Sequence, residues 1–229
     1  KEIYVKRLLP IVSVTLMCWL LVLALAACGS AIDGSEASRT AVAMRQSNPQ
    51  RTGEYPGPGP SEFHGAAWKF RTSHAVDSSP VVADGVVFVG NEDCYLYAVD
   101  ASTGKEKWKF EAGGTVRSSP AVAGGMVYFG SWDDCFYALD ANSGEERWKF
   151  ETGDLIISSP AISDGVVFFG SGDGYLYALD ANSGEEQWNF KTGDRVTSSP
   201  AVSDGVVFCG SDDGYFYALD ANSGEQRWK

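Results

Sequence analysis

Short blocks of consecutive apolar residues, separated by tight turns, recur through residues 68–229. In residues 156–192 the segments IISSPAIS, VVFFG and YLYALD are largely apolar, and the more polar EEQWNFKT follows them. Asp-Gly pairs at 164–165 and 173–174 and the ANSG turn at 181–184 separate these segments, and Asp-Gly is a strong signal for a hairpin. The pattern predicts a meander of four antiparallel strands whose inner strands, VVFFG and YLYALD, are buried on both faces.

The same pattern returns every 40 residues. The phrases VDASTGKEKW, LDANSGEERW, LDANSGEEQW and LDANSGEQRW end at Trp108, Trp148, Trp188 and Trp228. Units of four strands and about 40 residues are typical of β-propellers, in which each sheet stacks between copies of itself. A helical solenoid is excluded because these units lack a 3.6-residue apolar period, and a β-sandwich would need polar-out alternation on half of each strand. We therefore expect an all-β propeller fold with four four-stranded blades.

The N-terminal residues 1–27 are typical of a lipoprotein signal peptide. A basic stretch, KEIYVKR, precedes an apolar run that ends in LAAC at Cys28. Small residues before a cysteine resemble a bacterial lipobox, which predicts acylation of Cys28 and a lipid anchor in the membrane. An uncleaved membrane anchor is the alternative, because the apolar run is long enough to span a bilayer. Both interpretations place the remainder outside the cytoplasm. The residue after Cys28 is Gly29 and not the Asp that, by resemblance to bacterial lipoproteins, marks retention in the inner membrane, which favours the outer membrane or cell surface.

The rest of the chain divides into two further parts. Residues 28–62 are rich in Ser, Gly and Pro and have no apolar periodicity, which predicts a flexible tether. Residues 63–229 contain the propeller blades. The net charge of the whole chain is −12, so nucleic acid is excluded as a partner and an anionic bilayer surface would repel the chain. A protein or a small ligand remains as the kind of partner.

The repeated phrase A-x-D-x-x-[ST]-G-x-x-x-W, preceded by SSPAV and by GVVFFGSGDGYLYALD, resembles the repeat of pyrroloquinoline-quinone (PQQ)-type propellers. The resemblance implies that Trp108, Trp148, Trp188 and Trp228 are structural docking residues between blades. It also implies a ring of seven or eight blades, of which the four units would form an open half, with the AAWKF segment at 66–70 pairing at one end or lying loose. Two groups of proteins share the repeat: lipid-anchored lipoproteins that assist β-barrel insertion into outer membranes, and quinoprotein dehydrogenases.

The candidate chemistry for a dehydrogenase is incomplete. By resemblance, such enzymes surround the quinone with adjacent cysteines, a stacking Trp, a calcium ion and a catalytic Asp, but this chain has no Cys-Cys dipeptide. Cys94 and Cys135 occupy nearly equivalent places on neighbouring blades, and stacked sheets lie about 10 Å apart, so we expect free thiols. His64 and His74 are not spaced to bind a metal ion. We interpret SGDGY and SDDGY as hairpin turns in preference to calcium-binding loops. We therefore predict no catalytic residue, no metal and no cofactor, with PQQ and calcium only under the dehydrogenase alternative.

The four units differ mainly in the turns at one side of the predicted disc. The fourth-to-first connections read SHAVD, GGTVR, GDLII and GDRVT, and the second-to-third turns read NEDC, SWDD, SGDG and SDDG. We call the surface formed by these eight segments (73–77, 113–117, 153–157, 193–197, 91–94, 131–134, 171–174 and 211–214) the divergent face. Loops on a rigid scaffold commonly carry recognition, which favours a non-catalytic binding scaffold over the alternative, a fragment of a PQQ-dependent quinoprotein dehydrogenase. The candidate binding residues are His74, Asp77, Glu92, Arg117, Trp132, Asp154, Leu155, Arg195 and Asp212.

Overall fold

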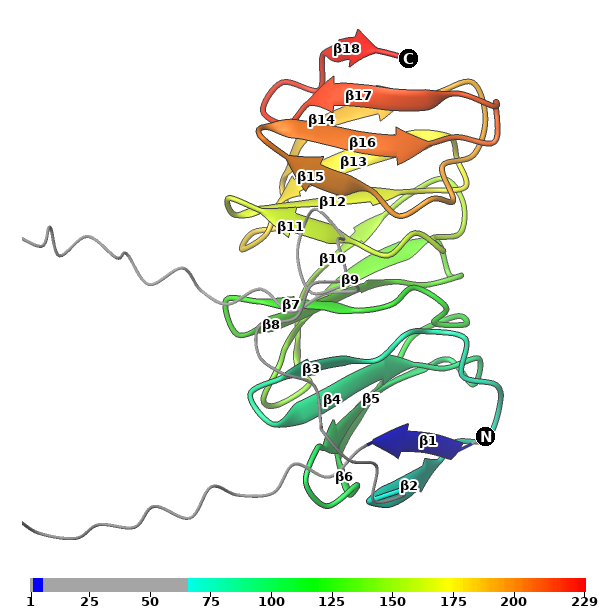
Figure 1. Ribbon diagram of the computed structural model, residues 1–229, viewed down its shortest axis with the longest axis vertical. Coiled ribbons are helices and arrows are strands. Elements are labelled where there is room, and N and C mark those ends of the chain that lie inside the picture. Colours follow the sequence, from blue (N-terminus) through cyan, green and yellow to red (C-terminus); the bar gives the residue numbers. More distant parts are fainter. Residues whose placement is uncertain (1, 6–65) are drawn as a thin grey trace, which may run out of the picture.

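The computed structural model describes residues 2–5 and 66–229 (Figure 1). Apart from the strand at residues 2–5, the predicted signal peptide, Cys28 and the predicted tether lie outside the described residues, as does His64. All regular elements in the described part of the chain are β-strands. It contains no helix capable of crossing a membrane.

Four sheets of four antiparallel strands follow one another along the chain, and each is one blade. Blade 1 contains β3 (Val81–Ala83), β4 (Val86–Gly90), β5 (Tyr95–Asp100) and β6 (Glu106–Glu111). Blade 2 contains β7 (Ala121–Ala123), β8 (Met126–Gly130), β9 (Cys135–Asp140) and β10 (Glu146–Glu151). Blade 3 contains β11 (Ala161–Ser163), β12 (Val166–Gly170), β13 (Tyr175–Asp180) and β14 (Glu186–Lys191). Blade 4 contains β15 (Ala201–Ser203), β16 (Val206–Gly210), β17 (Phe216–Asp220) and β18 (Gln226–Trp228).

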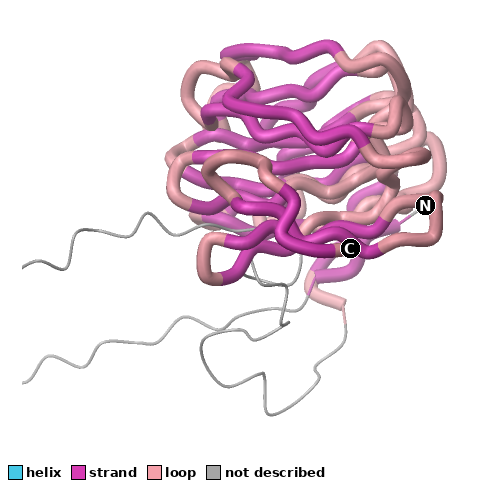
Figure 2. The backbone as a smooth tube through the Cα atoms, turned by 90° about the horizontal axis from the view of Figure 1, so that it is seen from above, coloured by secondary structure: helices cyan, strands magenta, loops and turns pink. Residues whose placement is uncertain are grey.

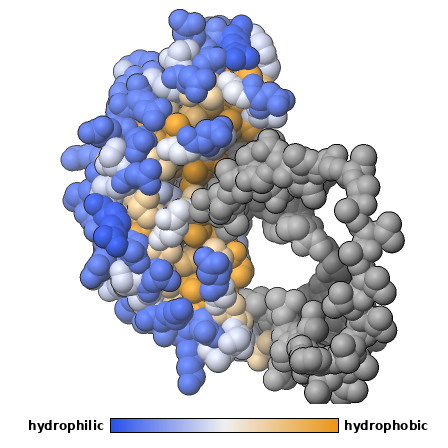
Figure 3. Space-filling model, turned by 90° about the vertical axis from the view of Figure 1, so that its left-hand side faces the viewer, coloured by the Kyte–Doolittle hydropathy of each residue, from blue (hydrophilic) through white to orange (hydrophobic). Residues whose placement is uncertain are grey.

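The predicted burial of the inner strands is confirmed. In blade 3, Phe168 and Phe169 are adjacent in β12 and point to opposite faces of the sheet, yet both are no more than 1% exposed. The outer strand β14 instead has mostly exposed positions, interrupted by the buried Trp188 and the partly buried Phe190. A sheet that is apolar on both faces must be covered on both faces, and the neighbouring blades supply this cover. Figure 3 shows further apolar residues at the surface along the described arc, next to a hydrophilic region.

The first strand of each blade is shorter than the sequence predicts. We expected a strand over residues 156–163 of blade 3, but β11 begins at Ala161. The backbone N–H of Ile156 donates to Ser131 in blade 2, and that of Ser159 donates to the Ser199 hydroxyl in blade 4. Pro160 has no N–H to donate. Residues 156–160 therefore form hydrogen bonds with neighbouring blades in place of a ladder with β12.

The blades are arranged as an open arc. The short first strands contact one another in the order β3, β7, β11, β15, and blades 1 and 4 lie at opposite ends of the molecule (Figure 1). Seen from above, the strands run through the body and the turns lie at its edges (Figure 2). At the blade 4 end, Phe216 is 53% exposed, whereas Leu176 at the same place in blade 3 is fully buried. The fold is therefore an all-β propeller arc of four four-stranded blades.

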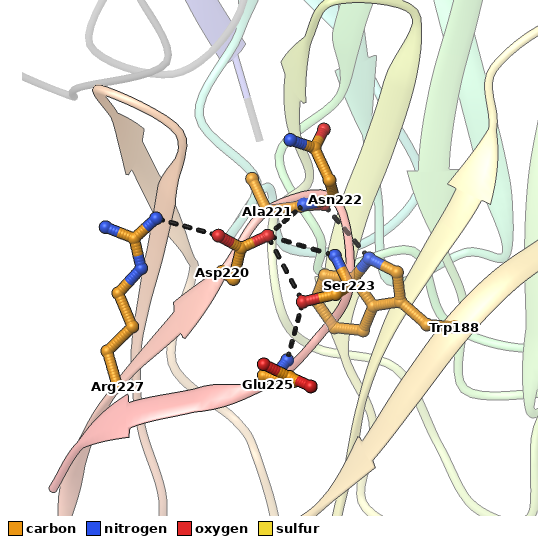
Figure 4. A network of polar contacts seen from close by, with 7 residues as sticks. All are labelled: Trp188, Asp220, Ala221, Asn222, Ser223, Glu225 and Arg227. Carbon is orange, nitrogen blue, oxygen red and sulfur yellow. Dashed lines mark hydrogen bonds and ion pairs between the residues drawn. The ribbon is translucent and has the colours of Figure 1, made fainter.

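In blades 1 to 3, the tryptophan of the outer strand packs on the third-to-fourth turn of the next blade. The indole N–H of Trp188 donates to the carbonyl of Ala221 at 3.0 Å (Figure 4). Trp108 and Trp148 make the same bond to Ala141 and Ala181, both at 3.2 Å. Trp228, in the last blade, is 50% exposed. Three of the four predicted docking residues thus contact a neighbouring blade in the described structure, and Trp228 does not.

The turn that receives each tryptophan is built by an aspartate. In blade 4, one carboxylate oxygen of Asp220 accepts the backbone N–H groups of Asn222 and Ser223, and the other accepts from Arg227 at 2.7 Å (Figure 4). The bond from Arg227, followed by the two backbone bonds, lowers the pKa of Asp220 to about 2. The turn ends at Gly224, whose φ of +72° suits glycine,. The Asp and Gly of the repeated phrase therefore shape the surface on which the previous tryptophan lies.

Segment AAWKF forms β2 (Trp68–Arg71), which pairs antiparallel with β1 (Glu2–Val5) in a two-stranded sheet. The prediction that this segment pairs at one end of the arc is confirmed, and the partner is a strand close to the N-terminus of the chain. The indole N–H of Trp68 donates to the carbonyl of Ala101 in blade 1 at 2.9 Å. β2 therefore contacts blade 1 as the outer strand of a preceding blade would.

Candidate functional site

The fourth-to-first connections and the second-to-third turns meet on one side of the arc, as the meander topology requires. Backbone N–H groups of Trp132, Gly172 and Asp212 donate to the carbonyls of Thr115, Leu155 and Arg195, respectively. On the opposite side, the third-to-fourth turns bond to the first-to-second turns in the same regular way, as from Ala181 to Gly165. The divergent face is therefore a continuous surface of paired loops on a rigid set of sheets.

One aspartate in each second-to-third turn has a structural role. In blade 2, Asp133 accepts the backbone N–H of Gly113 at 2.6 Å, the Tyr137 hydroxyl at 2.6 Å and the backbone N–H of Cys135 at 3.2 Å. Burial, followed by the bond to Asp133, raises the pKa of Tyr137, so this phenol remains a proton donor. Equivalent bonds are made by Asp93, Asp173 and Asp213. These carboxylates are occupied in holding the turns, and across residues 2–5 and 66–229 no group of three or more His, Cys, Asp and Glu side chains could hold a metal ion.

Four of the predicted binding residues come together where blades 1 and 2 meet on the divergent face. The guanidinium of Arg117 lies over the ring of Trp132, 4.4 Å from its centroid. Its Nη2 atom is 2.5 Å from the Glu92 carboxylate, and its Nε atom is 3.6 Å from the Asp77 carboxylate. We call these four residues the Arg117 cluster. They are brought together from four separate loops, so their proximity depends on blade stacking.

The Arg117 cluster has unused hydrogen-bonding capacity. The side chain of Arg117 is 37% exposed and that of Asp77 is 47% exposed. The indole N–H of Trp132 and the Nε–H of Arg117 are buried and have no hydrogen-bond partner among the described residues. A partly exposed arginine whose guanidinium lies over an aromatic ring combines a charge with an apolar surface, which suits recognition of another protein,.

The other predicted binding residues lie on the same face but outside the Arg117 cluster. His74 is exposed, and its carbonyl accepts from the Asn91 side chain. Asp154 accepts the backbone N–H of Leu155. Arg195 and Asp212 are exposed side chains in blade 4, joined by the backbone bond between their loops. The candidate site thus has its denser part at blades 1 and 2 and a looser, charged part at blades 3 and 4.

Two features of the divergent face were not found from the sequence. Cys94 and Asp134 adopt left-handed backbone conformations, with φ of +71° and +66°, at the place where Gly174 and Gly214 stand in the later blades. The alignment of units already showed this equivalence, and the glycines were the available signal for a positive φ. Burial, followed by repulsion from Asp154 and Asp133, also raises the pKa of Asp134.

Replacing Asp134 with glycine is expected to stabilise the protein. Removing a side chain from a left-handed position should raise the free energy of unfolding by about 0.5–1 kcal/mol. Because the pKa of Asp134 is higher in the folded than in the unfolded chain, the wild type loses stability as the pH rises through the carboxyl range,. The gain from Asp134→Gly should therefore be larger at neutral pH than in acid, as measured by denaturant unfolding at several pH values.

Cys94→Gly is the matched control, because it relieves the same backbone conformation without removing a carboxylate. Its gain should not change over this pH range. A loss of stability in both variants would show that the left-handed conformation at this position carries no strain.

The described cysteines are free thiols, as the sequence analysis predicts. Cys135 and Cys209 are buried. Burial raises the pKa of Cys209 to about 12 and raises that of Cys135. Both thiols remain protonated at neutral pH and are poor nucleophiles.

The stacked four-stranded sheets, the Asp-turn-Gly receptor and the docked tryptophans define the class of protein: a β-propeller of PQQ-type repeats. The sequence profile of one family matches residues 31–159 and 138–229. The chain belongs to this family, which is described as outer membrane protein assembly factor BamB. No curated protein matches the chain in sequence.

Solved structures share this fold at low sequence identity. BamB from Moraxella catarrhalis superposes with a TM-score of 0.66 and 22% identity, covering 72% of this chain and 56% of that one. The quinohemoprotein alcohol dehydrogenase ADHIIG from Pseudomonas putida HK5 gives a TM-score of 0.65 and 23% identity, covering 72% of this chain and 35% of that one. The computationally designed Ika4 protein gives 0.60 and 19%, covering 66% of this chain and 93% of that one. The chain thus spans about half the length of the BamB structure and about a third of the dehydrogenase.

Proposed function

We propose that this chain is a non-catalytic scaffold, held by a lipid anchor outside the cytoplasm, that binds a protein partner through its divergent face. The observation that supports this most directly is the Arg117 cluster, in which a stacked Arg–Trp pair with partly exposed charge stands on rigid sheets. Arginine and tryptophan are enriched among the residues that dominate binding energy in protein interfaces. The family description supports a partner that takes part in outer-membrane protein assembly.

The charges around the cluster bear on the chemistry of that partner. The eight segments of the divergent face contain ten acidic and two basic residues. The carboxylate of Asp77 lies 3.6 Å from the Nε atom of Arg117, and its side chain is 47% exposed. It can therefore form an ion pair with a basic side chain of a partner. A partner surface with basic residues around an apolar contact would complement both the acidic rim and the ring of Trp132.

The described residues do not suit PQQ with calcium. Adjacent cysteines are lacking in the sequence, and the turn aspartates already accept backbone and tyrosine donors. A fragment of a PQQ-dependent dehydrogenase remains the second candidate, because a quinohemoprotein dehydrogenase shares the fold. Adding PQQ and calcium to the purified chain distinguishes the two. The scaffold predicts no change in the quinone absorbance and no dye reduction with alcohols, whereas a saturable spectral change would favour the dehydrogenase fragment.

Alanine at both Arg117 and Trp132 is expected to weaken partner binding at least 30-fold, which corresponds to about 2 kcal/mol. The partner is first captured in the producing bacterium with a photo-crosslinking residue at position 132, and affinity for the purified partner is then measured by calorimetry. Asn182→Ala is the matched control, because Asn182 is an exposed turn residue on the opposite side of the arc. Equal affinity of the double variant and the wild type, or a loss caused by Asn182→Ala alone, would place the binding site elsewhere.

A further inference from the structure

The loops of the divergent face bond to one another in a fixed order across the arc. Within blade 3, the backbone N–H of Gly172 in the second-to-third turn donates to the carbonyl of Leu155 in the fourth-to-first connection. Between blades 2 and 3, the backbone N–H of Ile156 donates to the carbonyl of Ser131. Equivalent bonds join the other described blades. The connections that enter blades 2 to 4 therefore each lie between the turn of the preceding blade and the turn of their own blade.

Side chains that follow these bonds form a row along the divergent face. Arg117 contacts the Glu92 carboxylate of blade 1 and lies over the ring of Trp132 in blade 2. In blade 4, the hydroxyl of Thr197 donates to the carboxylate of Asp212 at 3.3 Å. This pair stands two repeats after Arg117 and Trp132 in the chain, so the contact between a connection and a turn recurs along the arc.

Ile157 extends the apolar surface of Trp132 into blade 3. The backbone N–H of Ile156 donates to the turn that carries Trp132, as the preceding connection donates to the turn that carries Glu92. That arrangement brings Arg117 against Glu92, so its counterpart one repeat later, Ile157, lies beside Trp132. The side chains of Trp132 and Ile157 are both partly buried. Arg117 and Ile157 thus flank the turn of Trp132 on its two sides.

The two ends of this row are acidic. At the blade 1 end, the side chain of Asp77 is 47% exposed, and at the blade 4 end Asp212 is exposed. The charge of Arg117 is offset by the Glu92 carboxylate that it contacts. The loop row, as we call it, consists of Asp77, Arg117, Trp132, Ile157, Thr197 and Asp212. It presents an apolar centre between two exposed carboxylates.

We propose that the loop row binds a segment of the protein partner in which an apolar side chain stands between two basic ones. This assignment rests on the proposed function, in which the divergent face binds a protein. The apolar side chain packs on Trp132 and Ile157, where apolar surface leaves water. The basic side chains pair with Asp77 and Asp212, whose charges they complement. Ile157 and Thr197 thereby join the binding residues expected from the sequence.

A phage-displayed library of random peptides, selected on the immobilised full chain, tests this pattern. Enriched peptides are expected to carry an apolar residue between lysines or arginines. A synthetic copy of the most enriched peptide should bind Ile157→Ser about tenfold more weakly than the wild type, because a polar side chain replaces the apolar contact. It should bind Asp212→Asn about threefold more weakly, and with a weaker dependence on salt. Calorimetry measures both affinities.

Asp204→Asn is the matched control for Asp212→Asn. Asp204 is also an exposed aspartate of blade 4 that accepts a hydroxyl at 3.3 Å, as Asp212 does. It stands in the first-to-second turn, on the opposite side of the arc. The peptide is expected to bind Asp204→Asn with the affinity of the wild type.

Three results would overturn the assignment of the loop row. They are enrichment of acidic peptides or of none, equal affinity of the wild type, Ile157→Ser and Asp212→Asn for the peptide, and equal losses in Asp204→Asn and Asp212→Asn. The double variant with alanine at Arg117 and Trp132 separates this outcome from failure of the proposed function. If only the double variant loses affinity, the proposed function stands and the loop row does not. If the double variant also binds as the wild type does, both are wrong.

Discussion

Replacing Trp188 with alanine is expected to lower the free energy of unfolding by about 3–5 kcal/mol. Trp188 is 8% exposed, packs in the core between blades 3 and 4, and donates to Ala221 at 3.0 Å. The substitution leaves a large cavity against Gly224 and an unpaired carbonyl in the receiving turn, so both packing and a hydrogen bond are lost. Denaturant unfolding followed by circular dichroism measures the change.

The chain supplies its own control in Trp228. This residue ends the same repeated phrase, but it is 50% exposed. Trp228→Ala should cost less, about 1–2 kcal/mol, because only about half of the side chain is buried, against Phe208 and Phe216 of its own blade,. Similar losses for Trp188→Ala and Trp228→Ala would show that blade docking does not set the contribution of these tryptophans.

Replacing Gly184 with alanine is expected to destabilise the protein by about 3 kcal/mol. Gly184 has a φ of +74°, and a Cβ atom there would lie 2.6 Å from the Cδ2 atom of Trp148. The left-handed conformation accounts for about 1 kcal/mol of the loss, and displacement of the docked indole adds about 2 kcal/mol. The same unfolding measurement applies, with the emission of the tryptophans as a second readout.

Gly165→Ala separates these two contributions. Gly165 has a nearly identical φ of +78°, but a Cβ atom there would meet nothing within 4 Å. The loss should be about 1 kcal/mol, from backbone conformation alone. Equal losses of unfolding free energy in Gly165→Ala and Gly184→Ala would show that the close approach of Trp148 to the receiving turn does not add to the cost of the Gly184 substitution.

Much of the blade was predictable because the forces that form it are local in sequence. Asp164-Gly165 and ANSG predict turns, since a positive φ favours glycine and an aspartate bonds the backbone two residues on. Strand boundaries followed these turns closely for β12 and β13. The repetition at 40 residues then required stacking, because a sheet apolar on both faces has no other way to leave water.

The prediction failed where hydrogen bonds cross between blades. The first strand of blade 3 is shorter than expected, because Ser159 donates to Ser199, 40 residues along the chain. The Arg117 cluster could be listed by residue but not assembled, since its loops meet only through stacking. The pairing of β1 with β2 joins residues more than 60 positions apart, and no local pattern specifies such a contact.

The repeat, the four-stranded meander, the apolar inner strands and the glycine-containing turns could be inferred from the sequence, because each follows from a short pattern of residue types that recurs along the chain. The folded chain was needed to show which tryptophans are covered, which acidic side chains hold turns and which hold Arg117, and which strand pairs with β2. Those outcomes depend on which blade lies next to which. Identical phrases therefore have different environments in the folded chain, as the burial of Trp188 and the exposure of Trp228 show.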